Sequence, residues 1–205
     1  MPLPLCSDDR RRLLRLARTT LTEVILYNRI PEAPAPSGRL AEPAGAFVTL
    51  HYRGRLRGCV GSAGRSLAVS ETVMQAAASA ARNDPRFAAI TAAELPEVEI
   101  EISVLSEPQP TTAGAIEVGR HGLLVMRGRK RGLLLPQVAT EHGWSAERFL
   151  EESCRKAGLE ADAARDPETE LLAFTADVFS EREVPAVTMG AEANRGPSGT
   201  PEPEP

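Results

Sequence analysis

The chain has 205 residues and a formal net charge of −4, and 42% of its residues are hydrophobic. The length favours one domain of ordinary size or one with a small second lobe. The negative charge excludes a general basic field for holding nucleic acid. No apolar stretch approaches the roughly 18 residues of a membrane span, and three widely spaced cysteines argue against a disulfide framework. Since residues 1–21 also lack the apolar region of a signal peptide, we expect a soluble, cytoplasmic protein.

The first helix is predicted over residues 7–30. Apolar side chains recur there at helical spacing, and Ser7 or Asp8 can cap the helix. The following stretch, residues 31–45, is rich in proline and alanine without periodicity, and it therefore predicts an exposed loop.

A β-hairpin and a second helix are predicted next. Residues 46–62 alternate as two strands around a turn at Arg53-Gly54. The clearest helix of the chain then begins near Ser66 and ends before Pro85. Its many alanines imply a close approach to the layer beneath it.

The second half of the chain predicts further strands and two shorter helices. Residues 98–104 alternate as a strand, with valine and isoleucine inward and Glu99 and Glu101 outward. The remaining predicted elements are a hairpin around residues 128–132, short helices starting near Pro136 and Ser145, and one last strand over residues 170–181. Strands and helices mix without a regular βαβ repeat, so the predicted fold class is α+β with a largely antiparallel sheet.

The end of the chain differs in composition from the rest. Residues 186–205 are rich in Pro, Glu and Gly and lack apolar periodicity, so we predict that they are disordered. A single folded domain over residues 7–185 remains.

Cys59, in the motif Arg57-Gly58-Cys59, is the first candidate functional residue. If Arg53-Gly54 is a two-residue turn, Val48 faces Cys59 and Leu50 faces Arg57, so the guanidinium and the thiol share one face of the hairpin. A cation that close favours the thiolate, which is the reactive form. The alternative is a small buried hydrophobe, a common role of free cysteine. Both interpretations stay open.

Seven short motifs occur in the order seen in one protein family. They are GAFVTL, GRLRGCVGS, NDPRF, VEIEISVLSEP, VGRHGLLV, GLLLPQVA and FLEESCRKAGL. On these motifs the chain resembles the AMMECR family, and the branch it is most similar to is the bacterial AmmeMemoRadiSam system protein A. The resemblance runs from about Arg11 to Glu181, and Val60 replaces the isoleucine usual in the central motif.

The resemblance implies a fold more than an activity. It implies two lobes, a larger one built from both chain ends and a smaller inserted one, with the cysteine motif facing the cleft between them. It also implies Memo-like and radical-SAM proteins as partners, because genes of this family tend to accompany genes for such proteins. No cofactor is implied, and no reaction is securely assigned to the family. The function must therefore be argued from the site itself.

Three further residues are candidates for the site. The motif NDPRF places Asp84 and Arg86 just past a helix end, where they can serve a local turn and ion pair or, as the resemblance implies, face the cleft. His121 lies between glycines and is either a structural histidine or a base for the Cys59 thiol. The arginines, Arg57 and Arg86, would suit a carboxylate or phosphate group of a substrate.

Metal and nucleic-acid sites find little support in the sequence. There is no C-x-x-C, no H-E-x-x-H and no lysine-serine continuation of a phosphate loop, so no metal site is predicted. The one dense basic stretch, Arg127 to Arg131, has no interleaved aromatics, and aromatic residues make up only 4% of the chain. A solvated hairpin tip explains it better than RNA binding. Cys154 lies on an apolar helix stripe and is predicted to be in the core.

Two functions from different classes remain. The favoured one is an enzyme, or a subunit of an enzyme system, with Cys59 and His121 as catalytic residues and Arg57, Asp84 and Arg86 as substrate-binding residues. The other is a non-catalytic adaptor that binds a Memo-like or radical-SAM partner and uses the cysteine motif as a packing joint. The sequence names no substrate for either.

Overall fold

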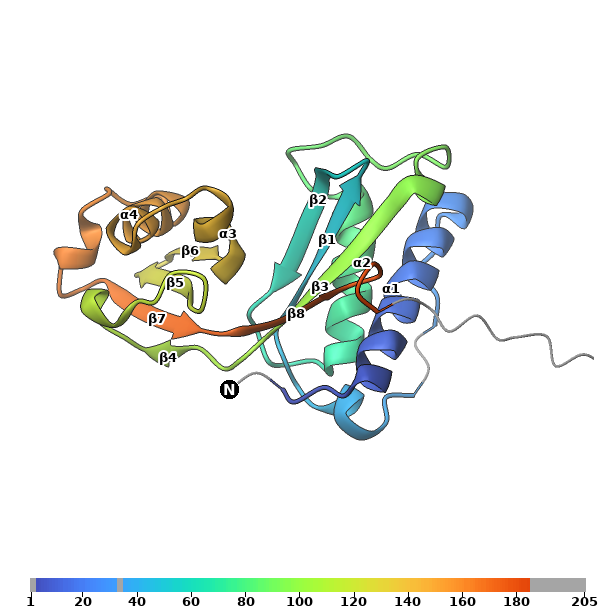
Figure 1. Cartoon of the computed structure of the whole chain (residues 1–205), viewed down its shortest axis with the longest axis horizontal. Helices are drawn as coiled ribbons and strands as arrows, with labels where there is room; N and C mark the ends of the chain where they lie inside the picture. The colour runs from blue at the N-terminus through green and yellow to red at the C-terminus, as the bar shows by residue number, and fades with distance from the viewer. Residues whose placement is uncertain (1–2, 33–34, 185–205) are drawn as a thin grey trace, which may run out of the picture.

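The strands form two separate four-stranded antiparallel sheets in the computed structural model, which describes residues 3–32 and 35–184 (Figure 1). The first sheet contains β1 (Ala46–Tyr52), β2 (Arg55–Ser62), β3 (Val98–Leu105) and β8 (Ala176–Ser180), in the order β2-β1-β3-β8. The second contains β4 (Gln109–Pro110), β5 (Gly122–Arg127), β6 (Lys130–Leu134) and β7 (Glu170–Phe174), in the order β4-β7-β5-β6. The predicted α+β fold is confirmed, and the predicted disordered tail lies outside the described residues.

Two long helices, α1 (Ser7–Tyr27) and α2 (Val69–Arg82), contact each other and cover one face of the first sheet. Helix α1 begins at Ser7 as predicted but differs in the residue that precedes it and in its C-terminal end. Cys6, not Ser7 or Asp8, precedes its first turn, and the Cys6 amide donates to the Asp9 carboxylate at 3.1 Å. The helix ends three residues early because Asn28 adopts a left-handed conformation with a φ of 56°.

The main core lies between these helices and the first sheet. Alternate residues of β1 and β3 point toward the helices, as the sequence predicts, and are buried. The fully buried members include Val48, Leu50, Ile100, Ile102 and Val104 from the strands and Leu13, Ala17, Leu21, Val69, Val73 and Ala77 from the helices. The opposite face of the sheet carries no helix of this pair.

The second sheet has its own helices, α3 (Pro136–Glu141) and α4 (Ala146–Lys156). Helix α4 packs on β5 and β6 and is capped as predicted, since the Ser145 hydroxyl accepts the Arg148 amide at 3.2 Å. Cys154 is fully buried in this helix, which confirms its predicted core position. In the described part of the chain, no helix combines the length and the apolar character that a membrane crossing requires.

The β1–β2 hairpin has the predicted turn but not the predicted register. Arg53 and Gly54 both have positive φ values, 51° and 74°, as a two-residue hairpin turn requires. Leu50 pairs with Gly58 whereas His51 pairs with Leu56, so Arg57 is an extra residue in a β-bulge. The prediction that Val48 faces Cys59 and Leu50 faces Arg57 is therefore wrong.

This bulge exchanges the two faces of β2 along the rest of the strand. Thr49, not Val48, pairs with Cys59. A Cβ on Gly58 would lie 2.4 Å from the Ala80 carbonyl oxygen of α2, so Gly58 faces the helices and Cys59 faces away from them.

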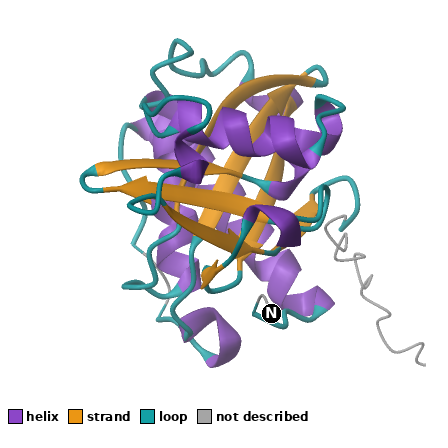
Figure 2. Ribbon diagram, turned by 90° about the vertical axis from the view of Figure 1, so that its left-hand side faces the viewer, coloured by secondary structure: helices purple, strands orange, loops and turns teal. Residues whose placement is uncertain are grey.

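The predicted last strand is in fact two strands in different sheets. Thr175 separates β7 from β8 where the chain returns from the second sheet to the first (Figure 1). It exchanges two hydrogen bonds with Ser106 in the outgoing connection, at 2.8 and 2.9 Å. Periodicity alone cannot detect this break, because alternation continues through Thr175. In Figure 2 the strands of the two sheets run in clearly different directions.

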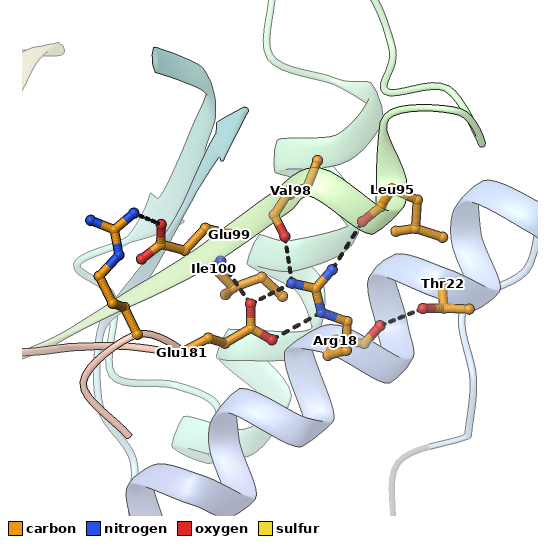
Figure 3. Close-up of polar contacts among 8 residues, drawn as sticks. Arg18, Thr22, Leu95, Val98, Glu99, Ile100 and Glu181 are labelled. Atoms are coloured by element: carbon orange, nitrogen blue, oxygen red, sulfur yellow. Dashed lines mark hydrogen bonds and ion pairs between the residues drawn. The ribbon is translucent and has the colours of Figure 1, made fainter. Parts of the chain in front are cut away.

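An arginine of α1 links the two ends of the chain to the first sheet (Figure 3). The Arg18 guanidinium binds the Glu181 carboxylate and donates to the carbonyl oxygens of Leu95, at 3.3 Å, and Val98, at 2.6 Å. Glu181 in turn accepts the Ile100 amide at 3.0 Å. Helix α1, the start of β3 and the residue after β8 are thus held by one group of charges.

We predict that Arg18→Ala lowers the free energy of unfolding by about 2 kcal/mol, because two carbonyls and a partly buried carboxylate lose a charged donor. Urea unfolding monitored by circular dichroism measures this loss. Arg15→Ala is the control, since Arg15 lies one turn earlier and is bonded to no other described side chain or carbonyl. Equal effects of the two substitutions would contradict the assigned role of Arg18.

Candidate functional site

Asp84 and Arg86 close the outer edge of β2 at Cys59. The Cys59 amide donates to the Asp84 carboxylate at 2.8 Å, and the Cys59 carbonyl accepts from Arg86 at 3.3 Å. Arg86 also binds both Asp84 oxygens, at 2.9 and 2.7 Å. Because β2 is an edge strand, these backbone groups have no neighbouring strand. The Asp84 and Arg86 side chains supply the hydrogen-bond partners that a neighbouring strand would give to Cys59.

The buried carboxylate of this clamp is strongly stabilised in its ionised form. Asp84 is only 3% exposed. Hydrogen bonds from the Arg86 side chain and from the Cys59 and Arg86 amides hold the pKa of the Asp84 carboxyl well below its usual range, against the opposing effect of burial. Asp84 and Arg86 are therefore brought to Cys59, but they contact its backbone.

The Arg57 side chain does not lie beside the Cys59 thiol but is bonded to the loop that follows α2. Its guanidinium binds Glu94 at 2.8 Å and the carbonyl oxygens of Ala88 and Ala89 at 2.6 and 3.1 Å. Hydrogen bonds from the Arg57 side chain, and secondarily from Thr91, lower the pKa of Glu94 to about 2. The expectation that Arg57 favours the Cys59 thiolate is thus wrong, because the bulge directs this arginine to the loop after α2.

The Cys59 side chain is partly exposed and lies on the face of the first sheet that α1 and α2 leave uncovered. The Thr49 hydroxyl, on the neighbouring strand, donates to the Cys59 sulfur at 3.3 Å. Burial raises the pKa of the Cys59 thiol, while the Thr49 hydrogen bond and the charge of Arg86 partly oppose this shift. The raised pKa favours the neutral thiol over a preformed thiolate.

Glu101 completes a row of polar side chains across three strands. Thr49 pairs with Cys59 on one side and with Glu101 on the other, so the three residues share one face. Burial raises the pKa of Glu101, and the charge of His51 and a hydrogen bond from Gln137 oppose that shift. The sequence pattern places Glu101 outward but gives no reason to single it out.

Gln137 connects the part of the chain built on the second sheet to the row Cys59–Thr49–Glu101. From α3 its amide nitrogen reaches Glu101 at 3.4 Å and the Ser103 hydroxyl at 3.1 Å. Its side-chain oxygen is buried without a hydrogen-bond partner among the described residues. Helix α3 therefore meets, beside Glu101, the face of the first sheet that α1 and α2 leave uncovered.

His121 has a local role at the start of β5. Its Nδ1 accepts the Glu117 amide at 3.1 Å, and its own amide donates to the Glu117 carbonyl. Within residues 3–32 and 35–184, no hydrogen bond joins it to Cys59. The histidine that acts electrostatically on the polar row is His51.

The basic stretch Arg127–Arg131 is divided among different surroundings. Arg127 pairs with Asp166 at 2.6 Å, and Lys130 donates to the Gly158 carbonyl at 2.8 Å. Arg131 lines a cavity between the two sheets. Across the residues that the structure describes, no group of three or more His, Cys, Asp or Glu side chains is arranged to hold a metal ion.

We predict that Asp84→Asn lowers the free energy of unfolding at neutral pH by about 3 kcal/mol. Arg86 loses its counter-charge, and one of the two oxygens that accept from Arg86 and the Cys59 amide is replaced by an NH2 donor. Because the native pKa of Asp84 is depressed, its contribution is complete above the unfolded pKa of about 3.9 and is lost as pH falls further. The difference between the two proteins should therefore shrink below about pH 4.

Urea unfolding over a pH series measures this difference. The control is Glu117→Gln, which removes an exposed ion pair with Arg120 and should cost well under about 1 kcal/mol. A difference that stays constant down to strongly acidic pH would contradict the depressed pKa of Asp84.

Comparisons with known proteins identify the family. The sequence profile of the AMMECR1 family matches residues 14–179. A protein of Methanothermobacter thermautotrophicus is 42% identical over 188 residues, covering 87% of this chain and 97% of its own, and one of Methanopyrus kandleri is 41% identical over 189 residues, covering 87% and 91%.

A solved structure agrees with these sequence matches. The crystal structure of an uncharacterized protein from Pyrococcus horikoshii superposes with a TM-score of 0.81 at 37% identity, covering 84% of this chain and 91% of that one. Sequence and fold agree over most of both chains, and the chain belongs to the AMMECR1 family.

Proposed function

We propose that the chain is an enzyme, or the reactive subunit of an enzyme system, and that its reacting group is the Cys59 thiol. The observation that carries the proposal is the row Cys59–Thr49–Glu101 on the face of the first sheet that α1 and α2 leave uncovered. The Asp84–Arg86 ion pair, of which the carboxylate is buried, fixes the backbone of Cys59 at the strand edge, while Cys59 itself stays partly exposed. Such positioning of one thiol is what nucleophilic catalysis requires.

The proposed reaction begins from the neutral thiol. The sulfur forms a bond to an electrophilic carbon of the substrate, the electron pair of the attacked bond moves onto its outer atom, and the thiol proton passes to Glu101. Glu101 is suited to accept it because burial raises the pKa of its carboxyl and makes it a stronger base. Thr49 lies between the two residues on the sheet face. Its hydroxyl, which donates to the sulfur at rest, would relay the proton by turning to accept from the thiol and donate to Glu101.

The adaptor remains the second candidate, and one observation favours it. The charged residues of the central motifs, Arg57, Asp84 and Arg86, are bonded to backbone groups and to each other or to Glu94. They therefore support the packing of β2, and both arginines among them already have partners within the chain. The reactivity of Cys59 separates the two candidates.

We predict that Cys59 is alkylated in the folded protein, with a midpoint above the ~8.5 of a free thiol. Cys154, which is fully buried, should react only after unfolding, and exposed Cys6 serves as the internal reference. Iodoacetamide labelling across pH, with mass spectrometry to assign each site, measures the rates. If Cys59 reacts only after denaturation, it is a packing residue and the adaptor becomes the better candidate.

Substitution of Glu101 tests the polar row in the same assay. The negative charge of Glu101 contributes to the raised pKa of the Cys59 thiol, so Glu101→Gln should move the alkylation midpoint downward. Glu99→Gln is the matched control, because Glu99 lies two residues earlier on β3 and pairs with Arg182. A shift of equal size in both variants would contradict a specific role for Glu101.

We further propose that the reaction uses Memo-like and radical-SAM partners, on the ground of the family resemblance. Co-expression of the three proteins under anaerobic conditions should give a complex, or a product that no single protein forms. Cys59→Ser should remove that product without removing the complex. If neither a complex nor a product forms, the partner proposal fails, while the alkylation result still decides the role of Cys59.

A further inference from the structure

A cavity of about 460 Å³ lies between the two sheets. The first sheet contributes Phe47 and the glycine-rich segment 61–64, and the second contributes a patch of β5 and β6. The volume lies within the roughly 300–1,000 Å³ of small-molecule sites. All of its lining residues belong to the described part of the chain.

The wall from the second sheet is apolar and half-buried. Leu124 pairs with Leu133, and Met126 pairs with Arg131, so these four side chains lie on one face of β5 and β6. The other face of the same strands is covered by α4, with Val125 fully buried. An apolar strand face that borders a cavity, while its reverse side is packed, is a surface for an apolar ligand.

The wall from the first sheet consists of Phe47 and the small residues of segment 61–64. Gly61 lies close against β1, because a Cβ on it would lie 2.2 Å from the Ala46 carbonyl oxygen and 2.5 Å from Phe47. A larger residue at position 61 would therefore push β1 and β2 apart at this wall.

Arg131 is the cation of this cavity. Unlike Arg57, Arg86 and Arg127, it forms no ion pair or side-chain hydrogen bond with another described residue. Glu170 lies on the same sheet face, across Met126 from Arg131, and is not paired with it. A guanidinium beside apolar walls suits a ligand with one oxyanion and an apolar body.

We infer that this cavity binds a small amphiphilic organic anion, whose carboxylate or phosphate group contacts Arg131 and whose apolar part lies against Leu124, Met126 and Leu133. This inference goes beyond the proposed thiol reaction and does not depend on it, since Cys59 is not among the lining residues.

The experiment uses the full chain and defined probes. Anilinonaphthalene sulfonate reports binding by its fluorescence, and octanoate, octyl phosphate and octanol compete with it. Octanoate or octyl phosphate should displace the dye, and the tighter of the two identifies the preferred anion. Octanol, which lacks the charge, should compete roughly tenfold more weakly or worse.

Arg131→Gln should weaken the better anion roughly tenfold and remove its advantage over octanol. Arg131→Lys should keep part of that advantage, because the charge remains. Arg129→Gln is the matched control, since Arg129 is in the same hairpin and does not line the cavity. A thermal melt of each variant checks that it is folded.

The inference is overturned if no probe binds the folded wild type, if octanol binds as well as the anions, or if Arg129→Gln has the same effect as Arg131→Gln. Cys59→Ser separates this result from the proposed function, because it should leave probe binding unchanged. A protein that binds the anions but has an unreactive Cys59 keeps this site and loses the thiol reaction. A protein that has a reactive Cys59 but does not bind the anions keeps the thiol reaction and loses this site.

Discussion

The hydrogen bond from the Cys59 amide to the buried Asp84 carboxylate is the constraint on which the arrangement of the site depends. It ties an edge strand to the segment that follows α2, where no further strand supplies an acceptor. Arg86 neutralises the charge of this carboxylate. It also donates a hydrogen bond to the Cys59 carbonyl, which has no partner strand either. These bonds lie in the plane of the sheet, so they leave the sulfur on the sheet face to which the bulge turns it, away from α1 and α2.

The bulge at Arg57 determines which residues can take part in chemistry. Without the extra residue, Cys59 would lie on the helix side of the sheet, where Val48 and Leu50 are fully buried. With it, the strand reverses its faces after the turn, and the thiol lies beside Thr49. Arg57 then lies where it donates hydrogen bonds to the carbonyl oxygens of Ala88 and Ala89. One added residue thus separates a structural arginine from a candidate nucleophile.

Patterns within one element were predictable from the sequence, and relations between elements were not. The inward face of β3, the Arg53-Gly54 turn and the burial of Cys154 follow from local periodicity and turn chemistry. The register of β2 was missed because a bulge has no signal in alternation, and the change of sheet at Thr175 was missed for the same reason. Glu101 joined the site only through strand pairing, which a single sequence does not specify.

The charges around the space between the sheets would orient a ligand in one direction. The Glu101 carboxyl lies on one side of this space, where the charge of His51 opposes the effects of Glu141 and Glu183, whereas Arg131 is the cation of the cavity. Gly61 lines the cavity and follows Cys59 by two residues on the same face, a rise of about 7 Å. An anion bound at Arg131 would be repelled by the Glu101 carboxylate.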